Sequence, residues 1–260
     1  MGQKKERIDK LLLERGLVET RSKGQAMIMA GEILVDKQPV TKAGQQVPAD
    51  AEIEVLAPAP YVSRGGYKLS AALDHFGIVI SDRVCADIGA CTGGFTDVLL
   101  QRDAFRVYAI DVGYGQLDWK LRNDSRVVVL ERTNARHLQS LPELVSFIAV
   151  DVSFISLRLV LPTAAAWLDE TGEIVCLVKP QFEAGRENVG KGGIVRDPAV
   201  HKRVLNDILQ WAAKNDLTPM NLIRSPIKGS SGNVEFLVHL KPGAAADNVI
   251  KTLIQGVIGH

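Results

Sequence analysis

Short apolar runs alternate with longer stretches in which apolar residues recur at helical spacing, along most of the chain after residue 63. The runs predict strands near 84–88, 106–111, 126–130, 147–151, 173–179 and 234–240, and the stretches predict helices near 68–76, 95–102, 115–122, 157–168, 198–214 and 249–258. Strands that alternate with helices in this way are typical of a doubly wound α/β domain, a Rossmann-like sheet.

The first 56 residues follow a different pattern. Two short helices are expected near 8–15 and 22–30, followed by short strands at 33–35, 46–47 and 53–56. The proline-containing stretch 56–60 reads as a semi-rigid spacer, because each proline fixes its own φ and restricts the residue before it. We therefore expect a small α+β domain over 1–56, a linker over 57–62, and the α/β domain over 63–260.

Composition narrows the class of protein. The 260 residues are 46% hydrophobic and carry a net charge of +1, so any basic surface must be local. The charged start and the absence of an apolar run of 18 residues argue against a signal peptide or membrane span. The three scattered cysteines, Cys85, Cys91 and Cys176, form neither a disulfide framework nor a metal site. We expect a reduced, cytoplasmic protein without a bound metal.

A loop of small residues between the strand at 84–88 and the next helix is the first candidate site. A strand that runs through glycines into a helix leaves bare backbone N–H groups at one spot, where a ligand can bind. The loop lacks the G-x-G-x-x-G spacing of dinucleotide enzymes. Instead Asp87 precedes it and Asp111 ends the next strand, which suits a ribose diol and is the pattern of S-adenosylmethionine (SAM) methyltransferases. The expected cofactor contacts are Asp87, Gly89, Ala90, Thr92, Gly93, Gly94 and Asp111.

Four ionisable residues are predicted to meet at the carboxyl edge of the sheet, where α/β folds place their sites. Asp151 and Lys179 each end an apolar run, Glu235 enters the last strand, and Lys68 comes from the helix before the first strand. A lysine beside a low-dielectric sheet can act as a base near neutral pH. Lys179 is therefore a candidate base, with the other three residues as its charged neighbours.

The segment 183–197 interrupts the strand–helix alternation. It contains four glycines and three basic residues, which predicts a mobile surface loop. Because it follows the strand that ends at Lys179, we interpret it as a lid that orders when cofactor and RNA are bound.

The first domain resembles the alpha-L RNA-binding fold. The resemblance rests on Arg7-Ile8-Asp9, Arg15-Gly16-Leu17, the stretch from Arg21 to Ala26, and Gly31 to Asp36. It implies that basic side chains contact RNA phosphates, which positions the RNA without reading its sequence. The expected RNA contacts are Arg7, Lys10, Arg15, Arg21, Lys23 and, in the second domain, Arg64.

Over its whole length the chain resembles the TlyA (haemolysin A) family of ribosomal RNA 2′-O-methyltransferases, an alpha-L domain followed by an FtsJ-like SAM domain. The segments that carry this resemblance are 63–69, 87–97, 111–117, 131–136, 151–157 and 178–183. The resemblance implies that Lys68, Asp151, Lys179 and Glu235 form the catalytic tetrad, and that Gly89 to Gly94, Asp111 and Asn134 bind SAM. For that chemistry we interpret Lys179 as the base or hydroxyl orienter, Asp151 and Lys68 as its electrostatic neighbours, and Glu235 as the group that orients the lysines. The resemblance also implies a cytidine in ribosomal RNA as the substrate, in the large subunit, with the small subunit as a second candidate.

Other functions remain open from the residues alone. Amino-group methylation is disfavoured because the segment after Asp151 lacks the two prolines that such enzymes carry, and cytosine C5 methylation because Cys176 lies within a strand. The remaining alternatives are a non-catalytic RNA-binding or ribosome-assembly factor and a membrane-active haemolysin.

Overall fold

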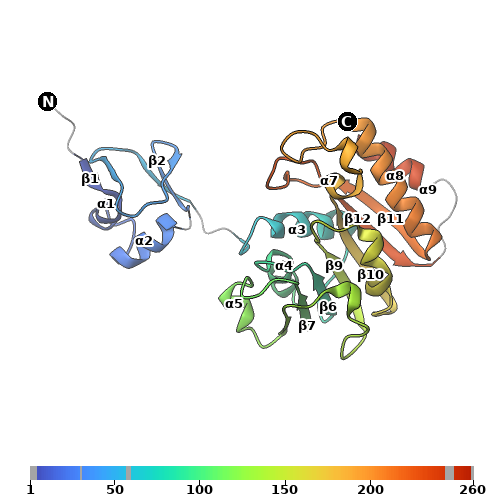
Figure 1. Ribbon diagram of the computed structural model, residues 1–260. Helices are drawn as coiled ribbons and strands as arrows, with labels where there is room; N and C mark the ends of the chain where they lie inside the picture. The colour runs from blue at the N-terminus through green and yellow to red at the C-terminus, as the bar shows by residue number, and fades with distance from the viewer. Residues whose placement is uncertain (1–4, 30, 57–59, 244–248, 259–260) are drawn as a thin grey trace. The chain divides into compact units, whose positions relative to one another are not determined.

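The computed structural model describes residues 5–29, 31–56, 60–243 and 249–258. The chain divides into two compact units, Met1–Pro60 and Tyr61–His260 (Figure 1). Of the expected linker, residues 57–59 lie outside the described part. Tyr61 and Val62 are bound to the second unit, because the Tyr61 hydroxyl donates to Ser70 Oγ (2.9 Å) and the Val62 N–H donates to Asp97 Oδ2 (2.8 Å).

The first unit is a small α+β domain. Its elements are β1 (Lys5–Arg7), α1 (Ile8–Glu14), α2 (Arg21–Met29), β2 (Ile33–Val35), β3 (Gln38–Pro39), β4 (Gln46–Pro48) and β5 (Ile53–Val55). Strands β1 and β4 pair antiparallel, and a second sheet has the order β3-β2-β5. Ile8 and Leu12 of α1 and Ile28 of α2 are buried in one cluster with residues of β2 and β4, so this unit has a core of its own.

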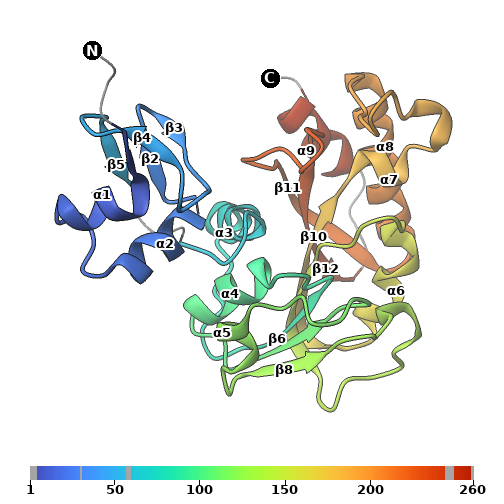
Figure 2. The same ribbon diagram turned by 60° about the vertical axis from the view of Figure 1, so that its left-hand side comes forward.

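The second unit is built on one seven-stranded sheet (Figure 2). Its elements are α3 (Gly65–Phe76), β6 (Val84–Ile88), α4 (Gly94–Gln101), β7 (Arg106–Ile110), α5 (Trp119–Arg122), β8 (Val127–Leu130), η1 (Ala135–His137), β9 (Val145–Val150), η2 (Leu157–Leu159), α6 (Leu161–Ala165), β10 (Leu168–Val178), α7 (Pro180–Glu183), η3 (Arg186–Asn188), α8 (Pro198–Lys214), β11 (Leu217–Arg224), β12 (Phe236–Pro242) and α9 (Val249–Ile258). The strand order is β11-β12-β10-β9-β6-β7-β8, with β6 to β10 parallel and β12 antiparallel to both of its neighbours. The predicted Rossmann-like α/β fold is confirmed.

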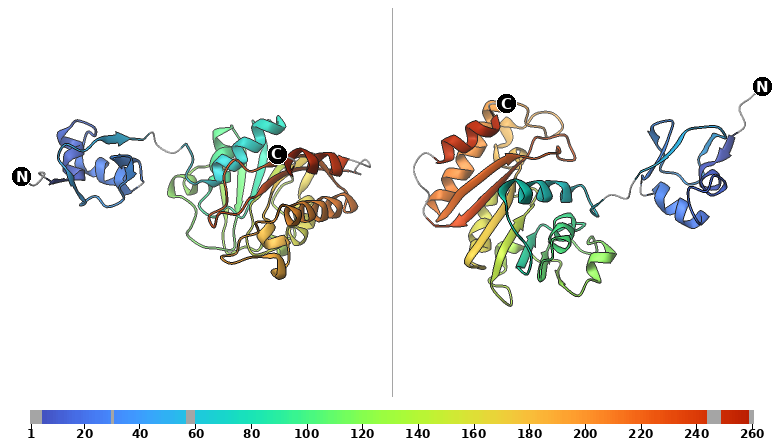
Figure 3. Two further views of the ribbon diagram at one scale, coloured as in Figure 1. Left: turned by 90° about the horizontal axis from the view of Figure 1, so that it is seen from above. Right: turned by 180° about the vertical axis from the view of Figure 1, so that it is seen from behind.

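The helices form layers on both faces of this sheet (Figure 3). Because neighbouring residues of a strand point to opposite faces, Cys85 belongs to the core cluster that includes α3 and α4, whereas Ala86 belongs to the cluster that includes α6, α8 and α9. Both faces of the central strands are therefore buried, which explains why these strands read as continuous apolar runs.

Two of the predicted helices are much shorter in the structure. The helix expected at 157–168 is divided into η2 and α6, and β10 already begins at Leu168. Pro162 explains the break, because it has no N–H to continue the hydrogen bonds of the preceding turn. The helix expected at 115–122 begins only after Asp118, whose side chain accepts the N–H of Lys120 as an N-cap.

The sequence pattern missed strand β11 and placed β12 two residues early. Strand β11 lies at the edge of the sheet and contains Pro219, where its register with β12 shifts. Proline is tolerated at such an irregular edge position, but it hides the strand from a pattern search. The short strands β1 and β3 were also missed.

The strand order places a binding crevice between β6 and β9. From β6 the chain proceeds to β7 and β8 on one side, and then crosses to β9 and β10 on the other. Ligands bind at such a switch point, beyond the carboxyl ends of the strands. The antiparallel β12 begins at this same edge, since Phe236 pairs with Val178 at the end of β10.

Candidate active site

In the glycine-rich loop after β6, position 89 requires glycine for two reasons. Its φ of +87° lies in the region that favours glycine, and a Cβ there would collide with the carbonyl oxygen of Asp151. The loop is held against the neighbouring strand because the N–H groups of Gly89 and Ala90 donate to the Ile110 carbonyl at 2.8 and 3.2 Å. Bare backbone therefore faces the crevice at the end of β6.

Asp87 lies beneath this loop. Its carboxylate is fully buried and accepts hydrogen bonds from the N–H (2.9 Å) and hydroxyl (2.7 Å) of Thr96 in α4. Burial raises the pKa of Asp87 to about 7, against the two hydrogen bonds from Thr96. Asp87 lines neither of the cavities described below, and its hydrogen bonds to Thr96 tie α4 to β6. Its predicted contact with a cofactor stays a prediction.

Asp111, at the end of β7, is held by the backbone on both sides. Its Oδ2 accepts the N–H of Cys91 at 2.8 Å and its Oδ1 accepts the N–H of Gly113 at 2.6 Å. Each carboxylate oxygen can accept a further hydrogen bond. Asn134, which caps η1 by accepting the Arg136 N–H, lines the same cavity as Asp111.

Two cavities of similar size meet at the carboxyl edge of the sheet, with volumes of about 460 and 450 Å³. We call the first the acceptor cavity and the second the cofactor cavity. The acceptor cavity contains Lys68, Lys179 and Glu235, together with Gly89, Ala90, Thr92 and Gly94 of the loop. The cofactor cavity contains Asp111 and Asn134 between apolar walls. The two share Gly89, Cys91, Asp151, Ser153 and Phe154, so these residues mark where their contents can touch.

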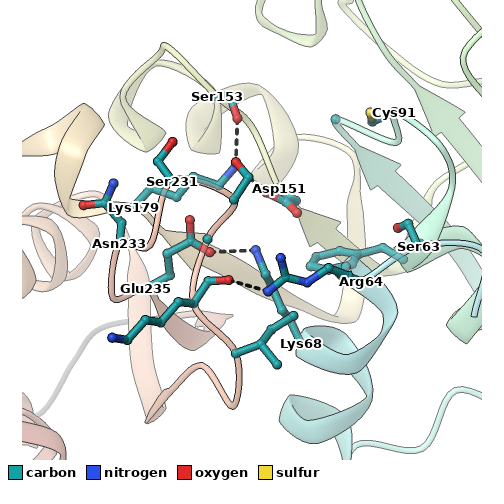
Figure 4. A pocket seen from close by; sticks show the side chains of 18 of the residues that line it. Ser63, Arg64, Lys68, Cys91, Asp151, Ser153, Lys179, Ser231, Asn233 and Glu235 are labelled. Atoms are coloured by element: carbon teal, nitrogen blue, oxygen red, sulfur yellow. Dashed lines mark hydrogen bonds and ion pairs between the residues drawn. The ribbon is translucent and has the colours of Figure 1, made fainter. Parts of the chain in front are cut away.

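The four predicted tetrad residues come together as two ion pairs (Figure 4). Lys68 Nζ lies 2.6 Å from Glu235 Oε2, and Lys179 Nζ lies 2.6 Å from Asp151 Oδ1. Lys68, Lys179 and Glu235 are all less than 10% exposed. Each buried lysine is thus neutralised by one carboxylate, as low-dielectric sites require. Glu235 was expected to orient both lysines, whereas in the structure its ion pair is with Lys68, and Asp151 holds Lys179.

The elements that carry these side chains explain their convergence. Asp151 and Lys179 directly follow the parallel neighbours β9 and β10, and Glu235 directly precedes the antiparallel β12. Lys68 comes from the first turns of α3, which packs on α4 above the same edge. Four positions spread over 168 residues of sequence are therefore brought to one corner by the sheet topology and by the packing of α3.

The basic residues predicted to bind RNA in the first unit all have intramolecular partners. Arg7 and Arg21 both bind the fully buried carboxylate of Asp9, at 3.0 and 2.9 Å, and Gln25 donates to it at 2.8 Å. The side chains of both arginines remain over 40% exposed. The hydrogen bond from Arg7, with those of Gln25 and Arg21, holds the pKa of Asp9 well below its usual range despite burial. The arginines are thereby fixed at the surface and keep outward N–H groups.

The other predicted RNA contacts differ among themselves. Lys10 and Lys23 are about half exposed and pair only with surface glutamates, Lys10 with Glu6 and Glu14 and Lys23 with Glu19. Arg15 instead donates to the carbonyls of Ala49 and Ala51, both at 2.7 Å, which ties α1 to the strands. Arg64 lines the acceptor cavity and donates to the Lys228 carbonyl.

Sequence reasoning missed several polar residues of the acceptor cavity. Ser153 accepts a hydrogen bond from Lys179 Nζ at 2.8 Å, and Gln181 Nε2 donates to Glu235 Oε1 at 3.4 Å. Asn233, which is 1% exposed, accepts the Val195 N–H and donates to the Gly193 carbonyl, both at 2.9 Å. Ser153 follows Asp151 by two residues, which is the one cue that the sequence held for it.

The segment 183–197 was predicted to be an open, mobile loop, but part of it is built into the domain. Its first residue belongs to α7, Arg186–Asn188 form η3, and Gly190 forms a bridge with Ile194. The hydrogen bonds of Asn233 hold the second half of the segment in place, and Val195 is buried. Gly193 reaches the acceptor cavity, so the segment forms one of its walls.

Metal-ligand clusters and membrane-spanning helices are both absent from the described residues. No group of three or more His, Cys, Asp or Glu side chains there could hold a metal ion. Among the helices in the described ranges, none is both long and apolar enough to cross a membrane.

Comparison with known proteins identifies the family. The FtsJ-like methyltransferase family matches residues 61–242, and the S4 domain matches residues 6–53. YqxC of Bacillus subtilis is 50% identical over 92% of this chain and 87% of its own length. The 16S/23S rRNA (cytidine-2′-O)-methyltransferase TlyA of Mycobacterium tuberculosis is 44% identical over 90% of this chain and 89% of its own length.

A solved structure extends the similarity to three dimensions. The structure of a Streptococcus thermophilus protein, 42% identical in sequence, superposes with a TM-score of 0.74 and covers 98% of this chain and 96% of its own. The resemblance drawn from the sequence motifs is therefore confirmed. The chain belongs to the FtsJ-like methyltransferase family, in its TlyA (haemolysin A) group, in which an S4 domain precedes the methyltransferase domain.

Proposed function

We propose that this protein is a cytoplasmic SAM-dependent methyltransferase that modifies the ribose 2′-oxygen of a cytidine in ribosomal RNA. In this proposal residues 1–56 bind RNA, 57–62 link the domains, and 63–260 carry out the reaction. The observation that supports it best is the Lys179–Asp151 ion pair, because Asp151 lies exactly where the cofactor and acceptor cavities share a wall. The TlyA relative from Mycobacterium tuberculosis is named for this reaction.

The cofactor cavity fits SAM in size and in the chemistry of its walls. A volume of about 450 Å³ lies within the usual range for small-molecule sites. Asp111 supplies a fixed carboxylate that suits the two ribose hydroxyls, and Ile110, Val112 and Ala135 supply apolar walls that suit the adenine. The bare backbone at Gly89 suits the amino-acid part. When bound, SAM supplies an electrophilic methyl group on a sulfonium.

The residues of the acceptor cavity have to orient a weak nucleophile. A ribose hydroxyl must approach the methyl group in line, and holding two reactants in that geometry can lower a barrier by roughly 7–11 kcal/mol. General-base assistance adds only ~10²–10⁴-fold. We therefore assign the main role of the site to positioning, with proton removal as the smaller contribution.

Lys179 is the group that we assign to the 2′-oxygen. Lys179 lines the acceptor cavity, and its Nζ lies 2.6 Å from Asp151 Oδ1, a residue of the shared wall. From there it can donate a hydrogen bond to that oxygen or, as the neutral amine, accept its proton. Asp151 fixes Lys179 from the cofactor side. Lys68 and Glu235 pair with each other, and neither contacts a residue of the shared wall through this ion pair, so we assign them to holding the ribose.

The exposed basic residues of the first unit suit the phosphates of a folded RNA. Asp9 holds Arg7 and Arg21, and part of each guanidinium can bind an outside acceptor. Lys10 and Lys23, which lie close to them in sequence, add two positive charges on flexible side chains. Such contacts supply affinity without base recognition, so the choice of nucleotide must come from RNA shape and from the acceptor cavity.

The test is the identity of the product. Ribosomal subunits from a strain that lacks this gene are incubated with the protein and SAM, and the RNA is then digested to nucleosides for mass spectrometry. We expect 2′-O-methylcytidine to appear. Methylation on a base, or on the ribose of another nucleoside only, would contradict the proposal, as would no transfer to naked RNA, to either subunit or to assembled ribosomes.

A further inference from the structure

Ser153 is placed to control the direction of Lys179. Its hydroxyl oxygen accepts a hydrogen bond from Lys179 Nζ at 2.8 Å, while Asp151 Oδ1 lies 2.6 Å from the same nitrogen. Ser153 itself is exposed, whereas Lys179 is 9% exposed, so the serine covers the lysine from the open side of the site. Figure 4 shows Ser153, Asp151 and the end of Lys179 grouped together, apart from the Lys68–Glu235 pair.

A single ion pair would leave the ammonium group of Lys179 free to rotate. An ammonium carries three hydrogens on a rotor around the Cε–Nζ bond, and one carboxylate can attract any of them. A second acceptor in a different direction removes that rotation. Ser153 accepts one hydrogen and the Asp151 carboxylate attracts the charge from a second direction, so the tetrahedral nitrogen has one direction left for an outside partner.

A third contact of Lys179, with an aromatic ring, does not compete for this direction. The centroid of the Phe182 ring lies 5.9 Å from Nζ, at the outer limit of a cation–π contact. A ring at that distance attracts the charge without orienting one hydrogen. The two oxygen acceptors therefore determine the geometry of the nitrogen.

Ser153 also lies on the wall that the two cavities share, as Asp151 does. Both acceptors thus stand where the methyl group and the ribose oxygen must approach each other. We propose that Ser153 is a positioning residue, which locks the rotor of Lys179 so that the free direction of Nζ meets the 2′-oxygen of the acceptor. This inference rests on the proposed function of Lys179 and extends it to a residue of the neighbouring turn.

The test compares Ser153→Ala with Ser153→Thr in the full-length protein. Ser153→Ala removes the acceptor and should lower the single-turnover rate of methyl transfer, at saturating SAM and RNA, by about 10- to 100-fold. The dissociation constants for SAM and RNA should stay within about threefold, because the bound ground state keeps its other contacts. Ser153→Thr retains a hydroxyl and should restore most of the rate.

A matched control is Ser146→Ala. Ser146 lies in the same strand that leads to Asp151, and its hydroxyl donates to the Val84 carbonyl at the opposite end of β9. It should leave both the rate and the binding unchanged. Thermal unfolding of all three variants checks that the fold is kept.

Three outcomes would overturn the inference: a normal rate for Ser153→Ala, a loss confined to SAM or RNA binding, or a folded Ser153→Thr that is as slow as the alanine variant. Failure of the proposed function is recognised separately. In that case the wild-type protein makes no 2′-O-methylated product, or Lys179→Ala is fully active, whatever Ser153→Ala does.

Discussion

The four charged side chains of the predicted tetrad form two specific pairs, and this pairing distinguishes residues of the same type. Lys68 and Lys179 are chemically identical, yet only Lys179 pairs with a residue on the wall between the two cavities. The motif predicted which four residues meet. It could not predict the pairing, because sequence order does not show which carboxylate a folded sheet places beside which lysine.

Asp87 illustrates the same limit. The acid before the glycine loop is readable from the sequence, but its role depends on the burial that the fold imposes. The carboxylate points to Thr96 of α4 and stabilises the strand–loop–helix turn. These hydrogen bonds support the loop, and the cofactor contact expected of Asp87 stays a prediction.

A pH dependence follows from this burial. Burial raises the pKa of Asp87 from 3.8 to about 7, so between these values the folded chain binds more protons than the unfolded chain. The free energy of unfolding should then fall as pH rises from about 4 to about 7. Asp87→Asn keeps an oxygen for Thr96 and should remove this component, which is on the order of 1–4 kcal/mol.

Denaturant titrations at pH 5 and pH 8 measure this effect for Asp87→Asn and the wild type. The wild type should lose more stability between the two pH values than the variant does. An identical pH dependence of the two proteins would contradict an elevated pKa for Asp87.

At the scale of elements, long periodic segments were predictable and irregular ones were not. Helix α8 is found at 198–214 as predicted, because one face carries the apolar stripe that covers the sheet. Strand β11 escaped prediction because Pro219 and a register shift disguise it, and α6 is short because Pro162 divides the segment. At such positions the local effect of a proline outweighs the periodic pattern of apolar residues.

The segment 183–197 shows how one buried side chain can order a glycine-rich stretch. Asn233 binds both the Gly193 carbonyl and the Val195 N–H, and these are contacts that no local sequence pattern contains. If the segment acts as a lid, its closing motion must occur around this fixed point.

Asn233→Ala should release the segment, because it leaves a buried N–H and a carbonyl without their partner. We expect trypsin to cut after the exposed Lys191 at least about tenfold faster than in the wild type, with methyl transfer reduced. Ser230→Ala, a change at an exposed position nearby, serves as the control. Equal cleavage rates for Asn233→Ala and Ser230→Ala would show that Asn233 does not restrain the segment.

At the scale of the whole molecule, the chain joins a unit with exposed basic residues to a unit with the paired cavities. The family resemblance predicted both RNA binding and methyl transfer, because its motifs lie in both units of the chain. The distribution of charge within the first unit was not readable. Arg15 supports the fold of that unit, whereas Lys10 and Lys23 project from it with only weak surface pairs.

The double variant Lys10→Gln, Lys23→Gln should therefore weaken RNA binding without harming the fold. If both lysines contact phosphates, the slope of log affinity against log salt should become shallower by about 1.4–1.8. SAM affinity should not change. Lys202→Gln with Lys214→Gln, two exposed lysines of α8, is the matched control and should leave the slope as it is. Equal slopes for the two double variants would place RNA elsewhere.

The most direct measurement of the central claim is methyl transfer by Lys179→Ala together with its SAM affinity by calorimetry. The alanine variant loses the group that faces the acceptor oxygen, while the loop and Asp111 that suit the cofactor remain. We predict at least about a thousandfold loss of methyl transfer, combining the positioning and proton-transfer contributions, with SAM affinity within about threefold of wild type. Undiminished transfer by this variant, or loss of SAM binding in a folded protein, would contradict the assignment of Lys179 to the acceptor oxygen.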